Sequence, residues 1–95
     1  MKLDITKEAV KWYENEYEIT EITSLRFFVR YGGVGGLVPG FSLGISLEEP
    51  NDIYAKKEID KLTFYIEQED KWYFEKHDLY IDFNQELNEP EFIYQ

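Results

Sequence analysis

Residues 24–47, with the sequence SLRFFVRYGGVGGLVPGFSLGISL, decide the fold predicted for this chain. From Leu25 to Tyr31 every second residue is apolar, and from Phe41 to Leu47 the same period returns, which is typical of strands with one buried face. Between them lie four glycines and the pair Pro39-Gly40. Glycine loses much backbone entropy on ordering and proline lacks an N–H donor, so neither favours a continued strand. The stretch therefore predicts two strands joined by a glycine loop.

The flanking segments add a helix and further strands. Val10, Tyr13 and Tyr17 recur at helical spacing after Thr6, whose hydroxyl suits an N-cap, so we expect a helix over residues 7–17. Alternating or β-branched residues predict further strands at 2–5, 53–57, 62–66, 79–83 and 92–94. The expected fold class is α+β, mostly β, with a single domain over residues 1–95.

The apolar faces of these strands predict one hydrophobic core. A short helix at residues 69–76 is expected to turn Trp72 and Tyr73 toward it. Three tyrosines, Tyr65, Tyr80 and Tyr94, fall on outward faces and suit a partner-binding surface. The residues predicted to form the core are Leu25, Phe27, Val29, Phe41, Leu43, Ile45, Phe64, Ile66, Ile81 and Phe83.

Charge and composition exclude several classes of function. The chain has 20 acidic and 10 basic residues, a net charge of -10, and residues 48–95 with 14 acidic and 5 basic residues carry -9 of it. This charge repels nucleic-acid phosphates and anionic membranes, and no apolar run approaches the ~20 residues that span a bilayer. The polar start does not resemble a signal peptide, so we expect a cytoplasmic protein. The absence of cysteine excludes disulfides, thiolate metal sites and cysteine nucleophiles.

Motifs for catalysis or metal binding find little support. Ser42 lies in a G-x-S-x-G pattern, but a nucleophile elbow needs a helix after the serine, whereas residues 45–47 continue a strand, so we expect Ser42 to be solvated. His77, the only histidine, stands in a polar turn that favours a structural role. We therefore predict a protein that is not an enzyme and has no cofactor or metal. Glu48, Glu49 and Asp52 lack the spacing of a calcium-binding loop, so we expect these acidic residues to form a solvated surface.

The order of strand, glycine loop and strand in residues 24–47 resembles the HesB-like family of A-type iron-sulfur cluster carriers. The segment 67–95, EQEDKWYFEKHDLYIDFNQELNEPEFIYQ, looks like that family's short helix, turn, I-D-hydrophobic strand at residues 81–83 and final β segment. The resemblance implies a HesB-like pseudobarrel of short strands capped by an N-terminal helix. It also implies a homodimer, because members of that family are often dimeric.

The cysteines with which that family holds its cluster are missing here. Val34 stands where the loop cysteine would be, and the Cys-Gly-Cys tail motif is absent. The resemblance thus implies a cluster-site loop without ligands, formed by Gly32, Gly33, Val34, Gly35 and Gly36. Two functions stay open on the sequence. One is a non-enzymatic HesB-like protein that binds a protein partner within iron-sulfur cluster assembly; the other is a small-ligand or hard-metal binding module that uses the glycine loop.

Overall fold

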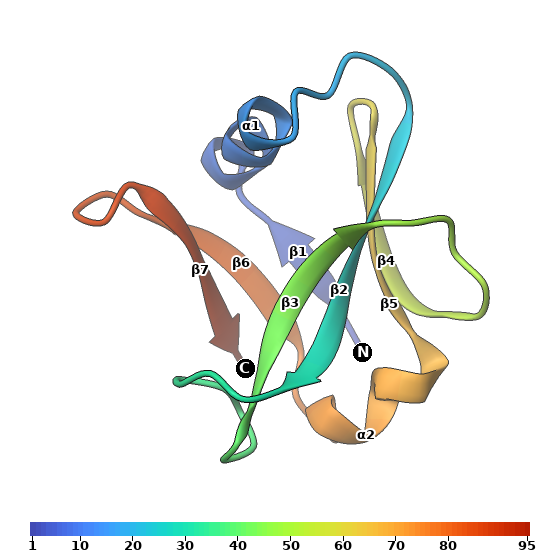
Figure 1. Ribbon diagram of the computed structural model, residues 1–95, viewed down its shortest axis with the longest axis vertical. Helices are drawn as coiled ribbons and strands as arrows, with labels where there is room; N and C mark the ends of the chain where they lie inside the picture. Colours follow the sequence, from blue (N-terminus) through green and yellow to red (C-terminus); the bar gives the residue numbers. More distant parts are fainter.

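Seven strands form two sheets that face each other across the core (Figure 1). A computed structural model describes residues 1–95. The three-stranded sheet has the order β1-β6-β7, and the four-stranded sheet has the order β3-β2-β5-β4. The pairs β1/β6 and β2/β5 are parallel and the others antiparallel. The elements are β1 (Leu3–Ile5), α1 (Lys7–Glu16), β2 (Thr23–Tyr31), β3 (Phe41–Leu47), β4 (Ile53–Ile59), β5 (Leu62–Glu67), a 3-10 turn η1 (Gln68–Asp70), α2 (Lys71–Phe74), β6 (Leu79–Asn84) and β7 (Glu89–Tyr94).

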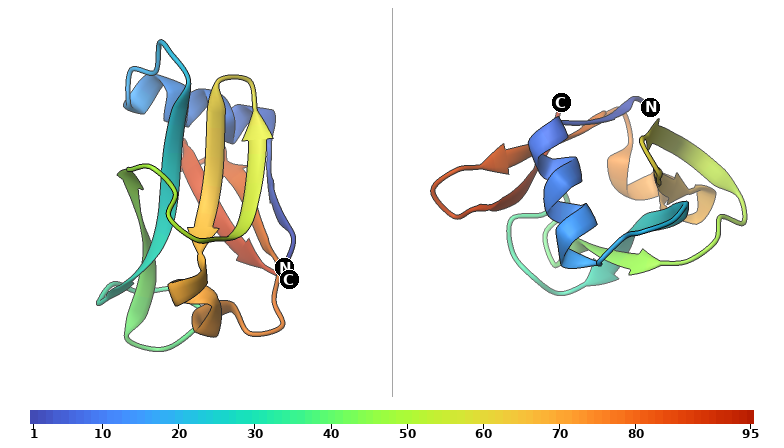
Figure 2. Two further views of the ribbon diagram at one scale, coloured as in Figure 1. Left: turned by 90° about the vertical axis from the view of Figure 1, so that its right-hand side faces the viewer. Right: turned by 90° about the horizontal axis from the view of Figure 1, so that it is seen from above.

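The two sheets do not close into a barrel. β1 contacts β4, while β3 and β7 are the free edges on the other side of the molecule, and α1 lies across one end (Figure 2). The predicted α+β class with mostly β structure is confirmed. The predicted HesB-like pseudobarrel is not found, because no strand pairs β3 with β7.

α1 begins where the sequence predicts it. The Thr6 hydroxyl accepts a hydrogen bond from the Ala9 backbone N–H at 3.2 Å, and Thr6 itself is extended, so it is the N-cap. Val10 and Tyr13 lie on the face that α1 buries. The helix ends at Glu16, and Tyr17 is its C-cap. The predicted helical period was therefore correct, and α1 ends one residue before the predicted end at residue 17.

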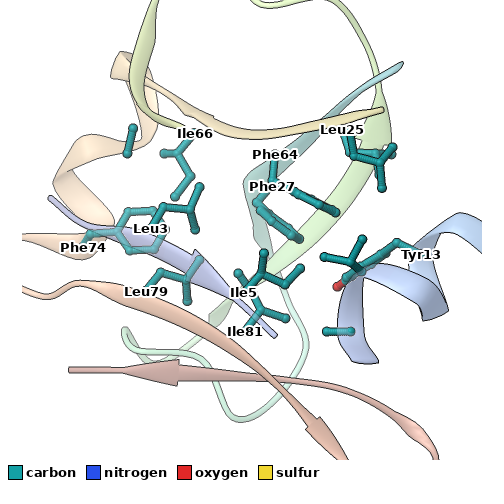
Figure 3. Packing of buried hydrophobic residues seen from close by; sticks show 14 of the residues in the cluster. Leu3, Ile5, Tyr13, Leu25, Phe27, Phe64, Ile66, Phe74, Leu79 and Ile81 are labelled. Atoms are coloured by element: carbon teal, nitrogen blue, oxygen red, sulfur yellow. The ribbon is translucent and has the colours of Figure 1, made fainter. Parts of the chain in front are cut away.

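The core is built around two stacked aromatic rings from neighbouring strands. The rings of Phe27 and Phe64 are 5.7 Å apart between centroids and nearly parallel, and both are fully buried (Figure 3). Tyr13 and Phe92 approach Phe27 at 5.9 and 5.5 Å in edge-to-face geometry. The helix and both sheets therefore meet at this pair.

Half of the predicted core is fully buried. Leu25, Phe27, Phe64, Ile66 and Ile81 are buried as expected. Four further residues contact the core from β3 or the adjacent end of β2 but are only half-buried, because β3 is an edge strand with a neighbour on one side only. They are Val29, Phe41, Leu43 and Ile45. Phe83 is half-buried and outside the core cluster, so this prediction was wrong.

Two aromatic residues lie opposite to the sequence prediction. Trp72 is half-exposed, and Phe74 instead joins Tyr73 in the core, because the 3-10 turn before α2 changes the helical phase. Tyr65 does alternate away from Phe64, yet it is fully buried. Its hydroxyl donates a 2.7 Å hydrogen bond to the Glu48 carbonyl, so the connection after β3 covers it.

Candidate functional surface

Ser42 and His77, the residues considered for catalysis, are both occupied by structural contacts. Ser42 is only 8% exposed, so the expected solvated position was wrong. Its hydroxyl donates to the Gly32 carbonyl at 2.9 Å and accepts from Arg30 Nε at 3.1 Å. His77 Nδ1 lies 3.1 Å from the Phe74 carbonyl, within the turn after α2. Neither side chain faces a second group with which it forms a nucleophile-base pair.

The acids considered for cation binding do not converge on one point. Glu48 accepts hydrogen bonds from Arg26 at 3.2 Å and from Ser46 at 2.6 Å. These donors hold the pKa of Glu48 below its ordinary value, with the Ser46 hydroxyl as the larger cause. No group of three histidine or acidic side chains is arranged to hold a metal ion. Arg26 also pairs with Glu69 and Asp70, so this cluster is an ion-pair network on the outer face of the four-stranded sheet.

The glycine loop owes its residue types to backbone geometry. Gly32, Gly33 and Gly35 have φ values of 105°, 78° and 78°, a region that other residues rarely adopt. Gly33 also lies against Ser42, since a Cβ there would approach the serine hydroxyl to 2.4 Å. The glycines are therefore needed to turn the chain between β2 and β3.

A buried tyrosine fixes the second half of the loop. The Leu37 backbone N–H donates to the Tyr73 hydroxyl at 2.6 Å, and the Tyr94 hydroxyl lies 3.3 Å from that of Tyr73. Burial and the hydrogen bond with Tyr73 raise the pKa of Tyr94 well above its ordinary value, so this phenol stays neutral at alkaline pH where an exposed tyrosine ionises. Gly36 fits closely here, because a Cβ on it would lie 2.0 Å from the Phe41 carbonyl oxygen. The loop is thus held on two sides, at Gly32 and at Leu37.

The glycine loop and α2 lie at the same end of the molecule (Figure 1), and both carry exposed apolar side chains. Val34 is 97% exposed at the loop, Tyr31 is 86% exposed at the end of β2, and Trp72 of α2 is 50% exposed. Phe41 joins them, with its ring 5.7 Å from Tyr31 and 5.3 Å from Trp72, both edge-to-face. We call these four residues the loop-end surface.

The segment that contributes Tyr31, Val34 and Phe41 to this surface is also free of charge. Residues 31–47 contain no charged residue, although 32% of the whole sequence is charged. A groove of about 350 Å³ lies beside Val34, bounded by Arg30, Leu43 and the rings of Phe92 and Tyr94. Aromatic enrichment and depletion of charge mark the centre of protein-binding surfaces. The predicted outward tyrosines contribute little to it, since Tyr65 is buried and Tyr94 is half-buried beneath the loop.

The fold and this surface together define a small α+β protein that presents exposed apolar side chains on an anchored loop. The chain belongs to the family of the pyruvate dehydrogenase inhibitor of Bacillus subtilis, to which it is 40% identical over 95 residues, with both chains covered in full. The relative's name describes an inhibitor of an enzyme, so the prediction of a non-enzymatic protein is confirmed. An inhibitor of this kind has a protein partner, in agreement with the predicted type of partner.

Further relatives occur in staphylococci. An uncharacterised protein of Staphylococcus saprophyticus is 39% identical over 92 residues, which are 94% of each chain. Another, from Staphylococcus aureus, is 42% identical over 78 residues, which are 79% of this chain and 80% of the relative. No family model and no solved structure match the chain.

The relationship corrects the family and function predicted from the sequence. The resemblance to HesB-like iron-sulfur carriers was wrong, and with it the expected link to cluster assembly and the alternative of a ligand or hard-metal module, since the full-length relative is named as an enzyme inhibitor. The glycine spacing that suggested that family is explained by the positive φ values of Gly32, Gly33 and Gly35. None of the helices has the length and apolarity needed to cross a membrane.

The loop-end surface itself was missed on the sequence. Alternation puts Tyr31 on a buried face because it does not show that β2 extends past the core, and Trp72 lies in a helix of four residues, too short for its period to indicate which side faces inward. The uncharged stretch 31–47 was the available signal, since a run of 17 residues without charge is unusual in so charged a chain.

Proposed function

We propose that this protein inhibits a pyruvate dehydrogenase by binding to it through the loop-end surface. The observation that carries the proposal is the 40% identity over the full length of a protein named as such an inhibitor. The loop-end surface adds a physical reason, because it offers exposed aromatic and aliphatic area and none of its four side chains carries a charge that would have to be desolvated.

The anchored loop supports binding as the mode of action. Tyr73 holds Leu37, and Ser42 holds Gly32, so Val34 is presented on a backbone that is already ordered. A partner that covers Val34 and Trp72 would pay little entropy for ordering them. Inhibition then follows from occupying a surface of the enzyme, with no covalent step. We place this activity in the cytoplasm and in a single domain over residues 1–95; the homodimer expected from the sequence stays a prediction.

The acidic remainder of the protein would affect the rate of association. Residues 48–95 carry a net charge of -9, and the loop-end surface is uncharged. Long-range attraction to a basic region of the target would speed encounter at low ionic strength, while the loop-end surface would determine the lifetime of the complex. Raising the salt concentration is therefore expected to slow association more than it speeds dissociation.

The test is titration of purified pyruvate dehydrogenase from Bacillus subtilis, the organism of the named relative, with the purified chain, followed by pyruvate-dependent reduction of NAD. We expect saturable inhibition by the wild-type chain. Trp72→Ala should raise the concentration needed for half-inhibition about 10- to 100-fold, the usual effect of removing a central aromatic residue. The matched control is Ile22→Ala, because Ile22 is 88% exposed in the connection between α1 and β2, at the opposite end.

Two results would contradict the proposal at different levels. Absence of inhibition by the folded wild-type chain would refute the proposed activity. Inhibition that Trp72→Ala and Val34→Asp leave unchanged would keep the activity and reject the loop-end surface as its site. Circular dichroism of each variant separates lost binding from lost folding, and both substitutions are at exposed positions where folding is expected to survive.

A further inference from the structure

β3 differs from the other strands at the edges of the two sheets. Edge strands usually carry charges, proline or a short length that prevents pairing with another chain. β1 has three residues, β4 carries Lys56 and Lys57, and β7 carries Pro90. β3 has seven residues, FSLGISL, with neither a charge nor a proline. It is the one edge of the four that has none of these protections.

The hydrogen-bonding groups of β3 that face away from β2 can be assigned from the register. The Gly32 N–H donates to the Gly40 carbonyl at 2.7 Å just beyond the paired strands. Because antiparallel pairs alternate, the residues of β3 that exchange hydrogen bonds with β2 are 42, 44 and 46. The backbone N–H and C=O groups of Leu43, Ile45 and Leu47 therefore point to the free side, where no strand follows in the sheet (Figure 1).

Gly44 lies at the centre of this edge and makes it self-complementary. The Phe28 ring covers Gly44 so closely that its Cζ is 2.6 Å from where a Cβ of Gly44 would be. In an antiparallel pair of two β3 strands centred on Gly44, the two glycines form a non-hydrogen-bonded pair with Cα atoms about 4.5 Å apart. The two Phe28 rings, one over each glycine, then come within about 4.5 to 7 Å, the range of favourable aromatic pairs. A side chain at residue 44 would displace both rings.

The same register brings opposite charges together twice. Residue 42 of one copy faces residue 46 of the other, two places from the centre on either side. Arg30 is bound to Ser42 at 3.1 Å and has no ion-pair partner in its own chain. Glu48 is bound to Ser46 at 2.6 Å. Each Arg30 guanidinium would therefore lie near Glu48 of the second copy, across the paired serines.

We propose that two copies of this chain associate through β3, antiparallel about Gly44, to form one continuous eight-stranded sheet. Leu43 of each copy exchanges backbone hydrogen bonds with Ile45 of the other. The half-buried apolar row of β3 is extended across the junction through Leu43 and Ile45, while Phe41 stays covered by the glycine loop, because its N–H is bound to the Val38 carbonyl and its own carbonyl lies against Gly36. The proposal does not depend on the identity of the inhibited enzyme, because it concerns the chain alone.

Sedimentation velocity of the full chain between about 1 μM and 1 mM tests the proposal. We expect a reversible monomer-dimer equilibrium. Ser46→Lys should raise the dissociation constant about 10-fold or more, because it places an ammonium opposite Arg30 of the second copy at both ends of the pairing. The matched control is Thr63→Lys, the same kind of change on β5, two strands from the junction, which should leave the constant unchanged.

Phe28→Leu provides a second variant with no change of charge. Loss of the aromatic pair should raise the dissociation constant by about 3- to 10-fold while the monomer stays folded. A wild-type chain that is monomeric throughout the range overturns the proposal, and so does a dimer that Ser46→Lys and Phe28→Leu leave intact. The proposal is also overturned if the wild-type chain is monomeric and Ser46→Lys abolishes inhibition, because β3 would then pair with a strand of the enzyme in place of a second copy.

Discussion

Gly36→Ala tests whether the glycine loop is anchored as described. Gly36 is not at positive φ, so backbone preference alone predicts that alanine is tolerated there. The structure predicts the opposite, because the new Cβ would lie 2.0 Å from the Phe41 carbonyl oxygen and 2.6 Å from the Tyr73 hydroxyl. The carbonyl belongs to the first residue of β3 and the hydroxyl is held by Leu37, so neither can move alone.

The size of the effect follows from these contacts. Inserting a methyl group into a filled space typically costs about 1 to 3 kcal/mol, and displacement of the Tyr73 hydrogen bond adds about 1 kcal/mol. We therefore expect a loss of about 2 to 4 kcal/mol in the free energy of unfolding. For a domain of this length each kcal/mol lowers the melting temperature by about 4 to 8 °C, so a shift of 10 °C or more is expected.

Gly35→Ala is the control for Gly36→Ala. Gly35 has a φ of 78° but no atom within 4 Å of its Cβ position, so alanine there carries only the strain of the left-handed region, about 1 to 2 kcal/mol. Both variants are compared by urea and thermal denaturation followed by circular dichroism. Equal or smaller destabilisation by Gly36→Ala would refute the description of the loop, since crowding by Phe41 and Tyr73 would then be absent.

Three further changes are expected to alter stability. Tyr73→Phe leaves the Leu37 N–H without its 2.6 Å acceptor and should cost about 1 to 3 kcal/mol in urea denaturation, whereas an unchanged midpoint would mean that water replaces the hydroxyl. Phe27→Ala removes a fully buried ring from the centre of the core and should cost about 3 to 5 kcal/mol, and a loss below 1 kcal/mol would place the core elsewhere. Folding lowers the pKa of Glu48 from its ordinary value of 4.5, so this carboxylate stabilises the folded state above about pH 4.5 and loses that effect as the pH falls through the lowered pKa. Ser46→Ala removes the larger cause of the shift and should therefore reduce the loss of stability at low pH. Thermal melting of both proteins between about pH 7 and 3 measures the difference.

Local sequence patterns predicted where helices and strands lie more accurately than they predicted which side chains are buried. The bounds of β3 and the Thr6 cap of α1 follow from alternation and capping chemistry, which depend on near neighbours. Tyr65 and Ser42 show where this fails: both alternate outward as predicted, but backbone outside their own strands covers them, the Glu48 carbonyl in the first case and Gly33 in the second. The parallel pairings of β1 with β6 and of β2 with β5 join segments that no local pattern connects.

The candidate surface was harder to predict because exposure at a strand end depends on the length of the neighbouring elements. Tyr31 continues the apolar period of Leu25 and Phe27, yet it extends past the core. Trp72 lies in a helix of four residues, which is too short for its period to be read. The false resemblance to iron-sulfur carriers arose in the same way, since glycines required by a turn look like glycines retained around a ligand.

The hydrogen bonds that hold the glycine loop at Gly32 and Leu37 have a kinetic consequence for any complex formed at this end of the protein. A loop that had to fold on contact would make association slow and would limit it by a conformational step. Here Val34 is already presented before encounter, so association should follow simple second-order kinetics with a rate proportional to concentration. Variants of the loop-end surface would then differ from the wild-type chain in residence time on the target. A shorter residence time would be measured as faster recovery of enzyme activity after the inhibitor is removed.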